Sequence, residues 1–228
     1  MNVEIWSDIA CPWCYVGKRR FEAALAGFDH RDEVIPTWRS FELDPGAPRE
    51  REQDNATHLA EKYGMSRQKA QEMHRTMTDA AASEGLDFRF DLVRSGNTFD
   101  AHRLLHLAAA NRLQDAMKER LMRAYLTEGE LIGDTQVLQR LAVEVGLPDD
   151  EVREVMLTER YAEEVREDER TATTLGISAV PFFVVDRTVA AAGAQPPELL
   201  REMLQRAWEA RPAIPVVATG ATCGPDGC

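Results

Sequence analysis

The sequence predicts an α/β fold in which one sheet-and-helix unit is interrupted by a long all-helical block. The chain opens with a strand, a helix and a strand, and it closes with two strands and a helix; residues 44–175 between them have helical periodicity almost throughout. Because the two outer parts together form a complete helix-on-sheet layer, we expect one domain built from residues 1–43 and 176–211. The block at 44–175 is then an insertion, and residues 212–228 form a tail.

The opening unit follows from the spacing of apolar residues. Residues 2–6 predict a strand, and residues 13–28 repeat their apolar positions at helical spacing. Pro12 fits the first turn of that helix, where a missing N–H costs little. Residues 33–40 predict a second strand, and Pro36 within it favours the edge of the sheet or a bulge.

The insertion and the closing unit are divided by glycines and prolines. Ser66, Asp134 and Asp149 are good helix-capping residues at three of the expected starts. Residues 182–185 and 188–192 predict two strands across a short turn. The helices are expected at residues 50–63, 66–84, 98–111, 114–128, 135–145, 149–175 (with a break inside it) and 198–210.

The composition excludes several classes of protein. The net charge of −12 disfavours a partner that is a nucleic-acid backbone or an anionic membrane surface, and 44% hydrophobic residues are enough for a sizeable core. No run approaches the roughly 18 apolar residues of a membrane span, and the first residues lack the basic start of a signal peptide. We therefore expect a cytoplasmic protein, and the oligomeric state stays open. In that compartment paired cysteines serve redox chemistry or metal binding more often than structure.

Cys11 and Cys14 lie at the predicted junction between the first strand and the first helix. The free N–H groups of a helix start stabilise a thiolate by about 1 kcal/mol, which lowers a thiol pKa of about 8.5 by about one unit. Further hydrogen bonds from backbone amides and from the Cys14 thiol are expected to lower the pKa more. We therefore expect Cys11 to be largely ionised at pH 7 and to attack external disulfides. Cys14, one turn deeper in the helix, is expected to resolve the mixed disulfide.

A single C-x-x-C motif also serves as half of a zinc site. The position between a strand and a helix is instead typical of a thioredoxin-like redox motif. We therefore favour redox chemistry and assign no metal ligands.

Four segments together resemble a known family: CPWC at residues 11–14, SGNTFDAHRLLHLA in the helical block, AVPFFVVD near the third strand and AGAQPPELL at the last helix. They are similar to the DsbA-like thioredoxin-fold oxidoreductases and, among these, to the FrnE subgroup. The match runs from residue 3 to about residue 210. The resemblance implies a thioredoxin fold with a helical insertion and thiol–disulfide exchange on protein substrates.

The resemblance also implies roles for single residues. Cys11 and Cys14 match the redox pair, and Pro181 matches the proline that follows a cis peptide bond in this fold. Backbone groups of Val180 are then expected to pair with an extended substrate as an added strand would. The ordinary trans bond stays as the alternative.

Other residues are candidates for contacts with substrate. Pro12 and Trp13 lie between the two cysteines, and Trp13 is expected to be exposed. Asn97 and His102 match the loop and helix start that face the active site in the family. A helix cap and a surface histidine are the alternative interpretation of these two residues. No cofactor is expected, with glutathione as a candidate redox partner.

A second pair, Cys223 and Cys228, ends the chain and departs from the family pattern. Three interpretations compete. The pair exchanges electrons with Cys11 and Cys14, joins them in binding an ion such as zinc, or belongs to a passive tail.

The leading hypothesis is a protein disulfide oxidoreductase acting as an oxidase, reductase or isomerase. The first alternative is a glutathione-linked isomerase or transferase of the 2-hydroxychromene-2-carboxylate isomerase or kappa class. Those proteins carry serine where this chain has Cys11, which disfavours that assignment. The second alternative is a metal-binding stress module that uses all four cysteines.

Overall fold

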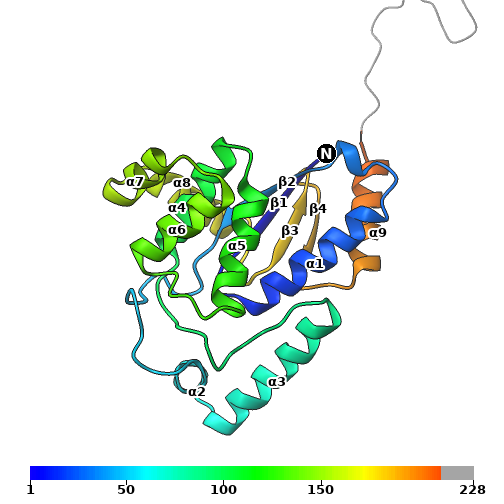
Figure 1. Ribbon diagram of the computed structural model, residues 1–228. Coiled ribbons are helices and arrows are strands. Elements are labelled where there is room, and N and C mark those ends of the chain that lie inside the picture. Colours follow the sequence, from blue (N-terminus) through cyan, green and yellow to red (C-terminus); the bar gives the residue numbers. More distant parts are fainter. Residues whose placement is uncertain (212–228) are drawn as a thin grey trace, which may run out of the picture.

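A computed structural model describes residues 1–211 and has a four-stranded sheet in the order β2-β1-β3-β4. The strands are β1 (Asn2–Ser7), β2 (Ile35–Ser40), β3 (Phe182–Val185) and β4 (Val189–Ala192). β1 runs parallel to β2 and antiparallel to β3, and β3 runs antiparallel to β4 (Figure 1). The predicted fold class, a thioredoxin fold with a helical insertion, is confirmed, and the strand that contains Pro36 lies at an edge as expected.

One face of the sheet is covered by α1 (Pro12–Ala26) and α9 (Pro197–Glu209). Their contact with the sheet is an apolar core in which β1 and β3 are central: Val3, Ile5, Phe21, Phe183, Leu200 and Leu204 are all buried. α8 (Ala162–Thr174) packs on the opposite face, where the indole N–H of Trp6 donates to the Asp168 backbone carbonyl at 3.0 Å. Because β1 is covered on both faces, nearly all of its residues are buried.

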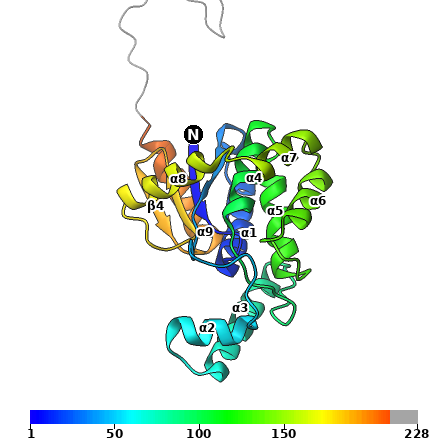
Figure 2. The same ribbon diagram turned by 90° about the vertical axis from the view of Figure 1, so that its left-hand side faces the viewer.

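The insertion lies between β2 and β3 and begins with two helices, α2 (Asn55–Tyr63) and α3 (Arg67–Ser83), which lie apart from α4 to α8 (Figures 1 and 2). α3 packs on α1, and its Ala81 belongs to the same apolar core as Cys14. The remaining helices of the insertion are α4 (Phe99–Ala110), α5 (Gln114–Leu126), α6 (Thr135–Val145), α7 (Asp149–Leu157) and α8. Their apolar core continues into the start of α1 through Cys14, Tyr15 and Val16. The insertion is therefore packed directly against the helix that carries the cysteine pair.

Capping residues set several helix boundaries. The side chains of Ser66 and Asp134 accept N–H groups at the starts of α3 and α6, as the sequence predicts. Asp149 is instead the first residue of α7, after Pro148 at the cap. α6 ends at Gly146, whose φ of 99° suits glycine.

The break expected within residues 149–175 separates α7 from α8, at Tyr161, which has left-handed backbone angles just before α8. One helix start differs from the prediction. The expected helix at 50–63 begins only at Asn55, because the preceding residues pair with another segment. Arg51 N–H donates to the Ser95 carbonyl at 2.8 Å, and a side chain at Gly96 or Gly133 would overlap the Arg49 backbone.

The edge of β2 is covered by a side chain of the insertion. The amide of Gln114, at the start of α5, accepts from the Trp38 N–H at 3.0 Å and donates to the Trp38 carbonyl at 2.9 Å. It thereby satisfies backbone groups that an edge strand would leave unpaired.

Among residues 1–211, none of the helices has the length and apolar composition needed to span a lipid bilayer.

A close contact between α1 and the loop that precedes β3 gives a testable prediction. A Cβ atom added at Gly17 would lie 2.8 Å from Cγ of Pro181, a ring that cannot rotate away. We expect Gly17→Ala to lower the free energy of unfolding by about 1–3 kcal/mol through overpacking, although alanine favours a helix.

Chemical denaturation measures this change. Gly27→Ala at the end of α1 is the matched control, because the atoms nearest to its Cβ would be those of the flexible Arg201 side chain. Equal stability of the two variants would contradict the prediction.

Candidate active site

The cysteine pair lies where β1 ends and α1 begins. Cys11 is the N-cap residue of α1, with φ −90° and ψ 111°, and Pro12 occupies the first turn. The Cys14 N–H donates to the Cys11 carbonyl at 3.0 Å. Both cysteines are free thiols; Cys14 is wholly buried, and Cys11 is 5% exposed. Cys11 is therefore the sulfur nearer to solvent.

The loop before β3 faces this pair. The Val180–Pro181 peptide bond is cis, as the resemblance implies, and the Val180 carbonyl lies 3.7 Å from Sγ of Cys11. Gly17 allows the Pro181 ring to pack directly on α1. This contact sets the distance between the loop and the thiol.

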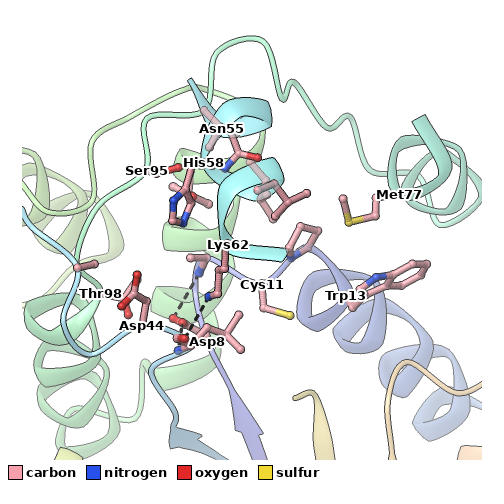
Figure 3. A pocket seen from close by; sticks show the side chains of 18 of the residues that line it. Asp8, Cys11, Trp13, Asp44, Asn55, His58, Lys62, Met77, Ser95 and Thr98 are labelled. Carbon is pink, nitrogen blue, oxygen red and sulfur yellow. Dashed lines mark hydrogen bonds between the residues drawn. The ribbon is translucent and has the colours of Figure 1, made fainter. Parts of the chain in front are cut away.

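A cavity of about 440 Å³ opens above Cys11. It lies between the start of α1, the loop at 178–180, and the pair α2 and α3 (Figure 3). Its lining includes Cys11, Pro12, Trp13, Val180, Lys62 and Met77. Trp13 is 38% exposed, in agreement with the expectation from its position between the cysteines. Because the exposed part of Cys11 faces this cavity, a reacting partner must enter it.

Three buried ionisable side chains lie beneath the cysteines, each from a different element. Asp8 follows β1, His102 is on α4 and Lys118 is on α5. Nε2 of His102 lies 3.3 Å from Oδ1 of Asp8, and Nζ of Lys118 donates to the Ser7 carbonyl at 3.1 Å. The Leu43 N–H donates to the other carboxylate oxygen of Asp8 at 2.8 Å.

These environments shift the pKa values of the three groups. Burial raises the pKa of Asp8, but the hydrogen bonds from His102 and Leu43 outweigh it and hold that pKa below its usual value. Burial lowers the pKa of His102 more than Asp8 raises it. Burial also lowers the pKa of Lys118 to about 8, although the charges of Cys14, Asp8 and Cys11 favour its ammonium form. A negative Asp8 and a positive Lys118 therefore both act on the thiols near neutral pH.

The structure corrects the expected pKa of Cys11. The Cys14 side chain, burial and the negative charge of Asp8 raise the pKa of Cys11 well above its ordinary value, and the Cys14 N–H lowers it only in part. These influences oppose the ionisation of Cys11 at pH 7 that the helix start predicts. Two sulfurs in contact lose their protons as a pair, and a second thiolate beside the first is strongly disfavoured.

The other predicted site residues fall into two groups. Pro12, Trp13 and Val180 line the cavity with Cys11. His102 is wholly buried, which contradicts both its predicted contact with substrate and the alternative of a surface histidine; its imidazole is hydrogen-bonded to Asp8. The Asn97 side chain does not line the cavity, because it bonds to the Phe99 N–H at 2.9 Å and points toward Glu42.

Two site residues were missed by sequence reasoning, and each carried a signal. Asp8 directly follows the apolar strand and precedes Cys11 by three residues. Lys118 occupies the apolar stripe of α5 beside Met117, Leu121 and Met122. A lysine in such a stripe is unusual, since a lysine is rarely buried without a partner.

Cys223 and Cys228 lie outside the described residues. Within residues 1–211, no three side chains of His, Cys, Asp or Glu are grouped so as to hold a metal ion.

A model of the DSBA-like thioredoxin domain matches residues 2–205. The chain belongs to this family. A crystal structure of a probable DsbA oxidoreductase from Streptomyces coelicolor is 48% identical, with a TM-score of 0.90, and the match covers 100% of this chain and 98% of that one.

A curated sequence relative and a further solved structure are more distant. The uncharacterized protein YwbO of Bacillus subtilis (strain 168) is 29% identical over 192 residues, which are 83% of this chain and 88% of that protein. The cytosolic disulfide reductase DsbM from Pseudomonas aeruginosa, solved also with GSH, is 19% identical. The DsbM structure has a TM-score of 0.66, and the match covers 92% of this chain and 99% of that one. The DsbM structure with GSH has a TM-score of 0.64, and the match covers 92% of this chain and 100% of that one. The DsbA-like family and its thioredoxin fold are thus shown for this chain.

The buried charges predict opposite effects of two substitutions on the pKa of Cys11. Asp8→Asn removes a negative charge that raises this pKa, so the pKa should fall by about one unit. Lys118→Met removes a positive charge that attracts the thiolate, so the pKa should rise by about one unit.

The rate of alkylation by iodoacetamide as a function of pH measures both changes, with Cys223 and Cys228 replaced by Ser in every protein. Lys69→Met on the exposed surface of α3 is the control. Shifts in the same direction would show that these charges do not act on the thiol.

Proposed function

We propose that this protein exchanges disulfides with protein substrates through Cys11 and Cys14. The observation that carries the proposal is the position of Cys11: it caps α1, faces the Val180 carbonyl and lies at the floor of a cavity, with Cys14 buried behind it. The family supports the broader activity, and the assignment of the cysteine pair and of its substrates is our own.

The two thiols of the protein supply the electrons and protons of the proposed reaction. The Cys11 thiolate attacks one sulfur of a substrate disulfide, and the other substrate sulfur leaves and takes up a proton. The Cys14 thiolate then attacks Sγ of Cys11, and the first substrate sulfur leaves as a second thiol. The substrate gains two electrons and two protons, and the protein is left with a Cys11–Cys14 disulfide. In the reverse direction, the protein oxidises a dithiol.

An extended substrate segment fits beside the loop at 178–180. Its backbone N–H would donate to the Val180 carbonyl in the manner of an added strand, next to the attacking sulfur. Pro12 and Trp13 would contact the substrate from the other side of Cys11. We propose Pro181 as a positioning residue, because its ring rests on Gly17 and holds this carbonyl in place.

Glutathione is a candidate small redox partner. DsbM, which is solved with GSH, shares the fold, and the cavity above Cys11 has a volume suited to a small ligand. The alternative of a glutathione-linked isomerase is less well supported, because two thiols within one helical turn suit disulfide exchange. We also propose a cytoplasmic location, in keeping with DsbM, which is a cytosolic reductase of the same fold.

Substitution of Cys11 and substitution of Cys14 should have different effects on the reaction. Cys11→Ser should abolish reduction of a disulfide-containing model protein, because the attacking sulfur is lost. Cys14→Ser should accumulate mixed disulfides with the substrate, because the resolving sulfur is lost.

Non-reducing electrophoresis and mass spectrometry detect the trapped species. A Cys223→Ser, Cys228→Ser double variant is the matched control and keeps the Cys11–Cys14 pair. Full turnover by Cys14→Ser would disprove the resolving role.

A further prediction concerns the terminal cysteines. We propose that Cys223 and Cys228 relay electrons to or from the main pair; the twelve residue steps from Arg211 to Cys223 span up to about 40 Å. Removal of residues 223–228 should slow the recovery of the reduced or oxidised main pair several-fold between turnovers.

A comparison of repeated-turnover with single-turnover assays distinguishes the recovery of the main pair from its first exchange with substrate. Equal recovery with and without residues 223–228 would contradict the proposed electron relay. Zinc binding by the full chain but not by the truncated chain would favour the metal-binding alternative.

A further inference from the structure

The cavity above Cys11 presents a cation to whatever enters it, in a protein whose net charge is −12. The ionisable residues in its lining, apart from Cys11 and the tyrosines, are Asp8, Asp44, Arg51, His58 and Lys62. Asp44 is ion-paired with Arg51, and the Asp8 carboxylate is buried and hydrogen-bonded to His102 and the Leu43 N–H. The charge of Asp44 is therefore balanced by Arg51, and neither carboxylate is ion-paired with Lys62.

Lys62 is a cation of the lining whose ammonium can still donate hydrogen bonds to a ligand. Its ammonium donates to the Leu43 carbonyl at 3.3 Å, and no Asp or Glu within residues 1–211 lies in ion-pair contact with it. An ammonium has three donors, so further hydrogen bonds are available for a ligand. Figure 3 shows that Lys62 and His58 both extend from α2 into the cavity.

His58 lies in the same local field. Burial lowers the pKa of His58, and the positive charges of Arg51 and Lys62 lower it further, while Asp44 and Glu61 oppose this shift only in part. The field at His58 therefore disfavours a further positive charge. An anionic group would find complementary charge here, and a cationic group would be repelled.

The rest of the cavity wall is mainly apolar. Met73 and Met77 line it from α3, and Leu59, Phe90 and Trp13 contribute from other segments. The volume of about 440 Å³ lies within the range of sites for small ligands. Since Cys11 is only 5% exposed and that surface faces the cavity, each disulfide that reacts with Cys11 must place its sulfur among these groups.

We propose that the cavity selects the disulfides that reach Cys11 by charge, and that Lys62 binds a carboxylate carried close to the reacting sulfur. The inference rests on the proposed function, since it specifies the substrate class of the same thiol. The preferred partner is a small or extended disulfide with an apolar body and a carboxylate a few bonds from sulfur.

The test uses a series of small disulfides that differ in charge. The reduced full chain, with Cys223 and Cys228 replaced by Ser, is mixed with 3,3′-dithiodipropionate, 2-hydroxyethyl disulfide or cystamine. The first of these carries two carboxylates, the second carries no charge, and the third carries two ammonium groups. In each case the protein dithiol becomes the Cys11–Cys14 disulfide, and the small disulfide becomes two thiols, so that electrons and protons balance. Each rate is divided by the rate of a small free thiol with the same disulfide.

The expected result is a preference for the dicarboxylate over the neutral disulfide of about tenfold, with cystamine slowest. Lys62→Met should remove most of that preference, Lys62→Arg should keep it, and added salt should weaken it. Lys69→Met is the matched control, because Lys69 is exposed on the neighbouring helix α3 and does not line the cavity.

The two proposals fail in different ways. A preference that is absent, or that is the same in wild type and Lys62→Met, overturns charge selection and leaves the proposed function standing. Failure of all three small disulfides and of a protein disulfide to oxidise Cys11 and Cys14 overturns the proposed function and this inference together.

Discussion

The packing of α1 against the loop that ends in Pro181 is the constraint on which the site depends. Gly17 has no side chain, so the Pro181 ring lies directly on the helix, and the Val180 carbonyl lies 3.7 Å from Sγ of Cys11. The start of α1 and this loop are about 170 residues apart in the sequence, and the central strands β1 and β3 bring them together. The helix, the thiol and the surface that we propose for an extended substrate are thereby held next to one another.

The helical insertion contributes to the chemistry as well as to the cover of the sheet. Its core continues into α1, and it supplies Lys118 and His102 beneath the cysteines. The charge of Lys118 acts through a buried, low-dielectric region, where it has a larger effect than at the surface. The pKa of Cys11 is raised mainly by the Cys14 thiol and by burial, with a smaller contribution from the charge of Asp8, and an argument from the helix start alone includes none of these.

The same insertion decides what can approach the sulfur. α2 and α3 close the cavity on the side away from the sheet, and they bring apolar side chains and the ammonium of Lys62 to it. Their position depends on the pairing of the segment before α2 with residues 95–97, where Gly96 and Gly133 leave room for the Arg49 backbone. Selection of substrates and reactivity of the thiol are thus set by different parts of one insertion.

The sequence by itself determined the order of strands and helices, the place of the cysteine pair and the exposure of Trp13, because these follow from local periodicity, capping and turn residues. It also carried enough of the family pattern to predict the cis bond before Pro181. Only the tertiary structure decided that His102 is buried, that Lys118 acts on the thiols and that Lys62 enters the cavity. Those facts depend on contacts between residues tens of positions apart, and burial and electric field are properties of such contacts and not of the local sequence.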